Sequence, residues 1–147
     1  MSGLSLDQAN LIVEQALAKS QEMGFHPLTV VVLDPGGHMK AMQRQDGSSI
    51  SRREIAEGKA YGTLSMGFGG RELQRRANKM SPLFFGALSD ATGGRMIPVP
   101  GGVLVRDATG AILGAVGISG DLSENDELCA VAGIAAASLV PDTGDPL

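Results

Sequence analysis

Lys59 is a residue whose type and position in this chain could support chemistry. On a predicted helix, at about 100° per residue, it falls in the apolar arc between the directions of Ile55 and Thr63. A lysine on an apolar face needs a counter-charge, a bound anion or a lowered pKa, unless its stem covers apolar surface while the ammonium reaches water. Lys59 is therefore a candidate ligand-binding or catalytic residue.

Arg44 and Asp46 close a predicted strand. Because side chains alternate along a strand, the two point to the same face if the strand continues this far. An arginine at a strand end can hold a carboxylate through two parallel hydrogen bonds, and a simple Arg–Asp surface pair is the alternative. Arg44 is thus a candidate carboxylate binder, and Asp46 a candidate proton carrier.

The two histidines, His26 and His38, have no spacing of the HxH or HExxH kind. This pattern does not support a three-ligand zinc centre. His38 follows the turn Asp34–Gly37 at the mouth of a predicted hairpin, where it is either solvated or binds a ligand. Axial ligation of haem iron needs only one imidazole, so His38 is also a candidate haem ligand. His26 is interpreted as a loop residue.

Backbone groups and one more acid complete the candidate set. Gly101 and Gly102 lie in a proline- and glycine-rich stretch, where their N–H groups either bind an anion or form a turn. Glu127, near the start of the predicted last helix, is a second candidate proton carrier. Ser119 lies in a Gly-Ile-Ser-Gly sequence that is not GxSxG, so a serine hydrolase is not indicated.

Composition excludes several classes of protein. The chain has 147 residues, a net charge of -4 and a pI near 5.1, which argues against nucleic-acid binding. The lone cysteine excludes an internal disulfide. The start of the chain shows no basic, apolar secretory signal, and no stretch approaches the roughly 18–20 apolar residues that span a bilayer. We expect a soluble, cytoplasmic protein with one domain over residues 1–147.

Hydrophobic periodicity and turn residues predict the elements that position these side chains. Two pairs, Ser5–Gln8 and Ser51–Glu54, have capping-box spacing. The predicted helices begin at Leu6, Ser51, Arg71, Pro82 and Ser123, the first ending near Gly24, the second near Met66 and the last near Val140. The predicted strands are Leu28–Leu33, Lys40–Arg44, Val103–Arg106 and Ala111–Ser119.

Hairpins in place of βαβ crossovers predict an α+β fold, an antiparallel sheet with helices packed on it. We expect the core to span residues 4–140 and the tail, Pro141–Pro146, to be frayed. From Leu128 to Val140 the last helix has no charged residue and many small ones. A helix that is apolar all round is normally covered on every side, so we expect it to form part of a homo-oligomer interface, with cover by the chain's own loops as the alternative.

The chain resembles the GlcG/HbpS family, known as haem-degrading or haem-binding, which also supplies the C-terminal domain of PduO-type proteins. The resemblance covers residues 4–139 and lies in the order of several motifs. These are Leu4–Ala9, Val32–His38, Arg44–Gly47, Lys59–Thr63, Pro98–Val103, Gly114–Gly120 and Asp126–Gly133. It implies a profilin- or PAS-like sandwich of two or three layers, homo-oligomeric assembly, haem as a cofactor and, in some relatives, a place in catabolism.

Two hypotheses follow. In the first, the protein binds a small anionic ligand such as haem near a subunit interface, with His38 on the iron and with Arg44, Lys59, Gly101 and Gly102 around the ligand. In the second, it is a cofactor-independent tautomerase, deaminase or hydrolase of a small conjugated or hydroxy acid, with Arg44 and Lys59 beside Asp46 or Glu127. Both expect Arg44 and Lys59 to share one cavity, and Lys59→Met to preserve the fold while abolishing binding or activity.

Overall fold

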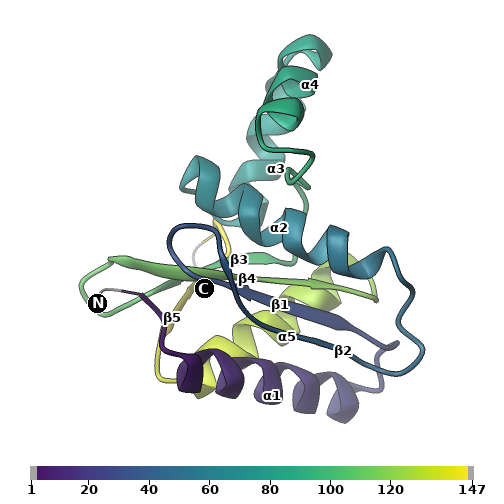
Figure 1. Cartoon of the computed structure of the whole chain (residues 1–147), viewed down its shortest axis with the longest axis vertical. Helices are drawn as coiled ribbons and strands as arrows, with labels where there is room; N and C mark the ends of the chain where they lie inside the picture. The colour runs from purple at the N-terminus through teal and green to yellow at the C-terminus, as the bar shows by residue number, and fades with distance from the viewer. Residues whose placement is uncertain (1–2, 146–147) are drawn as a thin grey trace.

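The computed structural model describes residues 3–145, which build a five-stranded antiparallel sheet of order β2-β1-β4-β3-β5. Helices α1 and α5 cover one face of the sheet and α2 covers the other (Figure 1). The elements are α1 (Leu6–Met23), β1 (Thr29–Leu33), β2 (Met39–Arg44), α2 (Arg52–Met66), α3 (Gly70–Lys79), α4 (Pro82–Ala91), β3 (Gly102–Arg106), β4 (Ile112–Ser119), α5 (Ser123–Ala136) and β5 (Val140–Asp142). The predicted α+β class is confirmed.

The inner strands are those with the most continuous apolar sequence. Every residue of β1 is buried, and the strand pairs antiparallel with both β2 and β4. On one face, Ile12 of α1 and Ile134 of α5 belong to the larger core cluster. On the other, Val31 of β1 packs with Ala56 of α2. Both faces of β1 are therefore covered, as its apolar run predicts.

Two glycines let α2 lie close against the sheet. A Cβ at Gly117 of β4 would collide with the carbonyl oxygen of Ala56, and one at Gly102 of β3 would collide with that of Lys59. Because any larger residue would push the helix away, these glycines fix the height of α2 above the sheet. The backbone of Lys59 is thereby held beside the start of β3.

Helix ends follow the sequence in one case and depart from it in another. Ser5 and Gln8 form the predicted capping box, and α1 ends at Gly24 with φ 70°. Ser51 lies in helical backbone, and within residues 3–145 its side chain makes no capping hydrogen bond. Capping-box spacing needs an extended N-cap residue, and Ser51 lacks that conformation.

The C-terminal segment corrects two predictions. Helix α5 ends at Ala136, not near Val140, and Ser138 takes φ 60° in the turn that follows. Val140–Asp142 then forms β5, which pairs antiparallel with β3 and brings Asp142 Oδ2 within 2.9 Å of Arg106 Nε. Thr143 is buried. The predicted frayed tail thus begins as a sheet edge that ends at Asp142 and stays packed on the body through the buried Thr143, and Pro146 lies outside the described residues.

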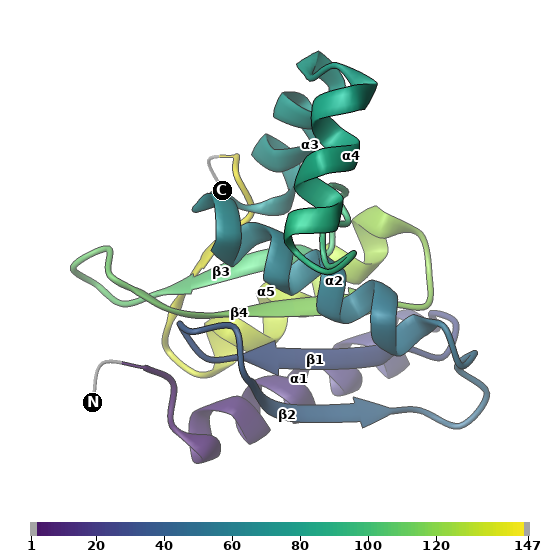
Figure 2. The same ribbon diagram turned by 45° about the horizontal axis from the view of Figure 1, so that its top comes forward.

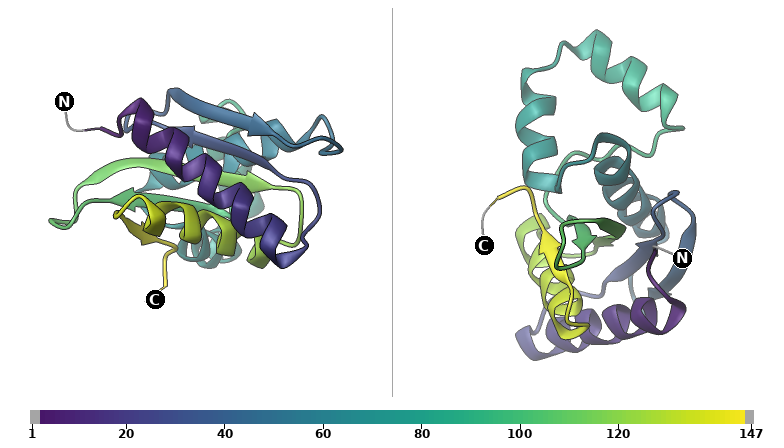
Figure 3. Two further views of the ribbon diagram at one scale, coloured as in Figure 1. Left: turned by 90° about the horizontal axis from the view of Figure 1, so that it is seen from below. Right: turned by 90° about the vertical axis from the view of Figure 1, so that its left-hand side faces the viewer.

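Helices α3 and α4 form an arm that stands away from the body on the α2 side of the sheet (Figure 2). The view from the side in Figure 3 shows both helices beyond α2, far from α1. Leu73 of α3 is buried, whereas no residue of α4 is buried within the described chain. Within residues 3–145, the buried side chain that anchors the arm is therefore that of Leu73 in α3.

Candidate functional site

His38 lies at the end of the β1–β2 turn, where Asp34 organises the backbone. The Oδ1 atom of Asp34 accepts hydrogen bonds from the N–H groups of Gly36 at 2.9 Å and His38 at 3.0 Å. The same oxygen lies 3.4 Å from His38 Nδ1, and the imidazole side chain is 83% exposed. Burial would raise the pKa of Asp34, but these two N–H donors, His38 and Lys40 together lower it below the usual range. Asp34 is therefore a carboxylate fixed by backbone N–H groups, with the exposed imidazole of His38 beside it.

An aromatic side chain from α2 supports this turn. A Cβ at Gly37 (φ 84°) would lie 2.6 Å from Tyr61 Cε2, so the ring packs directly against the glycine backbone. The guanidinium of Arg95 stacks over the Tyr61 ring, 3.6 Å from the ring centroid. A shallow cavity of about 100 Å³ lies beside them, lined by Pro35, Gly36, Gly37, Tyr61, Leu64 and Ser65. We call His38, Asp34, Tyr61 and Arg95 the His38 site.

Lys59 has a different environment. Its Nζ lies 3.2 Å from Asp126 Oδ2, with the two side chains 4% and 1% exposed. The other oxygen of Asp126 accepts a hydrogen bond from the Asp121 N–H at 3.0 Å. Burial lowers the pKa of Lys59 and raises that of Asp126, and the attraction between the two charges opposes both shifts. Of the options that the sequence left open, the structure thus provides a buried counter-charge, and the pKa of Lys59 also stays below its usual value.

The glycines near Lys59 have a packing role. A Cβ at Gly101, which has φ 111°, would lie 2.9 Å from Lys59 Nζ. Gly102 lies against the Lys59 carbonyl. The absence of side chains at Gly101 and Gly102 therefore leaves room for the backbone and the aliphatic stem and ammonium of Lys59. Lys59 on α2 and Asp126 on α5 come from opposite faces of the sheet, so their ion pair ties the two helix layers together (Figure 1).

Glu127 is also engaged. Arg71 of α3 donates to both of its carboxylate oxygens at 2.8–3.0 Å, and the Arg71 N–H donates to the Thr143 carbonyl. Arg75 reaches Asp145 and the Gly144 carbonyl. These bonds join the arm to α5 and to the C-terminal segment. A cavity of about 350 Å³ lies where the arm joins the C-terminal segment. It is lined by Gly67, Phe68, Gly69, Glu72, Arg75, Arg106, Asp142 and Gly144.

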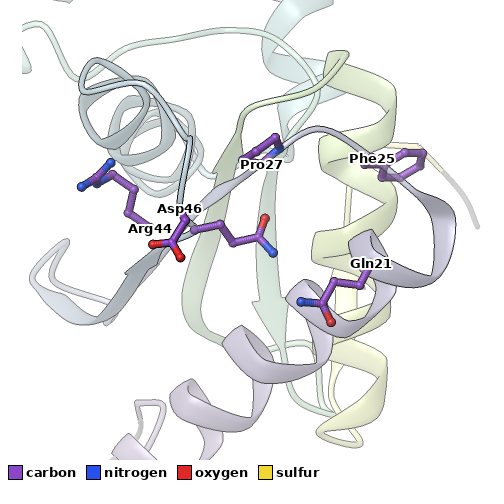
Figure 4. A pocket seen from close by; sticks show the side chains of 6 residues that line it. Gln21, Phe25, Pro27, Arg44 and Asp46 are labelled. Atoms are coloured by element: carbon purple, nitrogen blue, oxygen red, sulfur yellow. The ribbon is translucent and has the colours of Figure 1, made fainter.

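Arg44 and Asp46 lie elsewhere, at a cavity of about 440 Å³ (Figure 4). Its lining is Gln21, Phe25, Pro27, Arg44, Gln45 and Asp46. The guanidinium of Arg44 points away from Gln21 and Phe25, and its Nη1 donates to the Ser48 carbonyl at 2.9 Å. Lys59 is not in this lining, so the structure does not bring Arg44 and Lys59 into one cavity. The two lie on different elements with different partners.

Sequence reasoning missed three partners. Asp126 falls in the acidic first turn of α5, and the sequence patterns do not pair it with Lys59. Tyr61 and Arg95 are 34 residues apart in the chain and meet only in the fold. A lysine in an apolar arc, followed later in the chain by a helix with an acidic start and an apolar remainder, was the available signal for the ion pair.

The described residues form neither a metal-binding cluster nor a membrane-spanning helix. Among residues 3–145 no three His, Cys, Asp or Glu side chains gather closely enough to hold a metal ion. In that same part of the chain, every helix is too short or too polar to cross a membrane. Cys129 is buried, and burial raises the pKa of its thiol to about 12.

The three layers and the motif order define a class of small α+β proteins. The sequence model of the family described as "Haem degrading protein HbpS-like" matches residues 4–135. The chain therefore belongs to the HbpS-like family, as its sequence motifs predict.

Individual relatives agree with this assignment. An uncharacterized 15.0 kDa protein from the dhaT-dhaS intergenic region of Citrobacter freundii is 30% identical over 127 residues, 86% of this chain and 87% of that protein. The crystal structure of HbpS has a TM-score of 0.78 at 28% identity, covering 92% of this chain and 90% of that one. ORFY of Klebsiella pneumoniae scores 0.81 at 26% identity, covering 94% and 92%. The complex of PduOC with haem scores 0.81 at 24% identity, covering 93% and 96%, and shares the fold.

Proposed function

We propose that the protein binds haem at the β1–β2 turn, with His38 as the axial ligand of the iron. The observation that carries this proposal is an exposed imidazole whose Nδ1 faces the carboxylate of Asp34. Histidines that bind metals commonly give their other ring nitrogen to a carboxylate, which fixes the tautomer and orients the ring. Asp34 is itself held by two backbone N–H groups, which fix the position of the carboxylate beside the ring.

The surroundings of His38 fit an anionic porphyrin. Tyr61 and Leu64 offer an aromatic and an aliphatic surface beside the turn. Arg95 and Lys40 lie near the same turn and would attract the two carboxylates that haem carries. Bound haem supplies redox and oxygen chemistry, while the protein supplies the ligand, the polarity and the cover of the iron.

Membership of a family described as haem-degrading supports this ligand, as does the haem complex of the structurally similar PduOC. For this chain the proposal stands on the His38 site.

The enzyme hypothesis is the weaker proposal. Lys59 is joined to Asp126 and Glu127 to Arg71, so both would have to break a buried or half-buried ion pair before acting on a substrate. Neither residue lines any of the three cavities described above, all within residues 3–145. Arg44 and Asp46 do line a cavity, but the Arg44 guanidinium is already engaged with the Ser48 carbonyl.

Titration with haemin tests the haem proposal. We expect the wild-type protein to shift the Soret band of haemin to a saturable end point with one haem per chain. His38→Ala should abolish this shift, while His26→Ala, which removes the other imidazole, should retain it. An unchanged spectrum and affinity in His38→Ala would show that His38 is not the ligand.

A further inference from the structure

Two arginines differ from most others in this chain because no acidic side chain pairs with them in the described structure. Within residues 3–145, five of the eight arginines form an ion pair with an aspartate or a glutamate. These five are Arg53, Arg71, Arg75, Arg76 and Arg106. Arg95 stacks on the ring of Tyr61. In the part of the chain that the structure describes, this leaves Arg44 and Arg52 with an unneutralised charge.

The sheet brings Arg44 and Arg52 to the same end of three neighbouring strands. Arg44 of β2 lies opposite Thr29 of β1, and Thr29 lies opposite Ser119 of β4. Residues opposite each other share a face of the sheet, so these three side chains form one row. At one end of the row, Arg52 Nη1 donates to Ser119 Oγ at 3.1 Å, and at the other, Arg44 Nη1 donates to the Ser48 carbonyl at 2.9 Å. Because neighbouring strands lie roughly 4.8 Å apart, the row is about 10 Å long.

Buried hydroxyl groups form the base of this row. Thr29 Oγ1 lies 2.8 Å from Ser48 Oγ, and the exposed fractions of Thr29, Ser48 and Ser119 are 0%, 4% and 1%. Arg44 is exposed and Arg52 is half-buried. The hydroxyl groups therefore hold a fixed base, while solutes can reach the arginines above it.

The acids closest to Arg52 on its own helix are engaged elsewhere. Glu54 and Glu57 lie 3.6 Å and 3.7 Å from the guanidinium of Arg53. Burial is the main cause of the lowered pKa of Lys59, and the charge of Arg52 adds to that lowering. The Arg52 guanidinium thus acts on a second cation, and an anion beside it would be attracted by both.

Arg44 is not neutralised by the nearest acid in its sequence either. Asp46 lies at the cavity on the α1 side, and in Figure 4 its carboxylate and the Arg44 guanidinium point in different directions. The bond to the Ser48 carbonyl uses one of the five N–H donors of a guanidinium. It holds the group in place and leaves its charge and its other donors available.

We propose that Arg44 and Arg52 together bind a small dicarboxylate, with one carboxylate on each guanidinium. A guanidinium can hold a carboxylate through two parallel N–H···O bonds, and two negative groups offset the repulsion between the two arginines. Ser119 accepts a bond from Arg52 and has its own O–H to donate to the ligand. His38 precedes β2 and Arg44 ends it, so this site is separate from the proposed haem site.

Titration with succinate, followed by the amide resonances of the ¹⁵N-labelled full chain at low ionic strength, tests the proposal. We expect saturable shifts at Arg52 and Ser119 with one succinate per chain. Arg44→Gln and Arg52→Gln should each weaken binding at least about tenfold, because each removes a charge-assisted pair. Propionate, which has one carboxylate, should bind at least about tenfold more weakly than succinate for the same reason.

Arg53→Gln is the matched control, since it removes the neighbouring charge on α2, which Glu54 and Glu57 already engage. It should bind succinate as the wild type does. Arg52→Lys keeps the charge without the planar fork and serves if Arg52→Gln unfolds, with a weaker affinity expected. A wild type that shows no saturable succinate binding, equal affinities for succinate and propionate, or equal losses in Arg53→Gln and Arg52→Gln would overturn the proposal.

Discussion

The Lys59–Asp126 pair and the His38 site each place a basic side chain beside an aspartate, and they differ in how much of the basic side chain stays exposed. At Lys59 the side chains are 4% and 1% exposed and face each other across two helix layers. At His38 the imidazole is 83% exposed and Asp34 faces one side of the ring. In the first arrangement both charged groups are engaged with each other and buried, whereas in the second the imidazole remains accessible to a ligand.

This contrast separates structural from functional polarity. A buried charge draws attention in a sequence because it is costly, but a good partner removes both the cost and the reactivity. An exposed histidine is ordinary by composition, yet a carboxylate beside one ring nitrogen is an arrangement that is common around metal-binding histidines. The better candidate for ligand binding is therefore the exposed imidazole of His38 and not the buried, paired ammonium of Lys59.

Breaking the buried pair should have the largest effect. Lys59→Met leaves the Asp126 carboxylate, and Asp126→Ala leaves the ammonium, uncompensated in the interior. We expect each to lower the free energy of unfolding by about 3–5 kcal/mol, measured by urea denaturation. The apolar arc around Lys59 alone predicts the opposite for Lys59→Met, because it does not show the partner.

The double variant Lys59→Met/Asp126→Asn is the control for that experiment. It removes both charges and keeps a side-chain oxygen for the Asp121 N–H, so most of the lost stability should return. If the single variants unfold at the wild-type urea concentration, the ion pair does not tie the layers as described.

Weakening the orientation of His38 should have an intermediate effect. Asp34→Asn replaces the carboxylate with a neutral amide and should weaken haemin binding about tenfold, the range seen when a ligand's supporting group is removed. The comparison variant is Asp46→Asn. Asp46 follows the C-terminal end of β2, whereas Asp34 lies before its N-terminal end, so Asp46→Asn should bind haemin as the wild type does. Equal affinities for Asp34→Asn and the wild type would remove the support that the proposal draws from Asp34.

Acid should reveal a smaller effect at the same residue. The folded-state pKa of Asp34 lies below its unfolded value of 3.8, so its contribution to stability is present above that value and is lost as the pH falls through the folded pKa. Asp34→Asn should therefore lose less stability than the wild type between pH 4 and about pH 2, in thermal unfolding followed by circular dichroism. Parallel curves over this range would contradict the lowered pKa.

Local patterns predicted the body of the fold well. The apolar run at residues 28–33, the hairpin turn at Asp34 and the Ser5 capping box each depend on neighbours within a few residues. These features appear in the structure because propensity, turn chemistry and burial agree there. The family motifs, taken in order, supported the same architecture.

Long-range partners could not be predicted. Lys59 and Asp126 are 67 residues apart, and the choice among counter-charge, ligand and lowered pKa depends on which acid the fold brings near. The end of α5 was also misplaced, since the uncharged run to Val140 satisfies a helix and a sheet edge equally well. Helix α4 was predicted from its proline and apolar residues, but no local signal shows that it stands away from the body.

The absorbance spectrum of the haemin complex in two variants tests the central claim most directly. Lys59→Met/Asp126→Asn alters the buried pair and leaves the β1–β2 turn intact, whereas His38→Ala alters only the exposed imidazole. The account predicts a wild-type Soret band and affinity for the double variant and neither for His38→Ala. A wild-type spectrum for His38→Ala, with loss of haemin binding in the folded double variant, would contradict it.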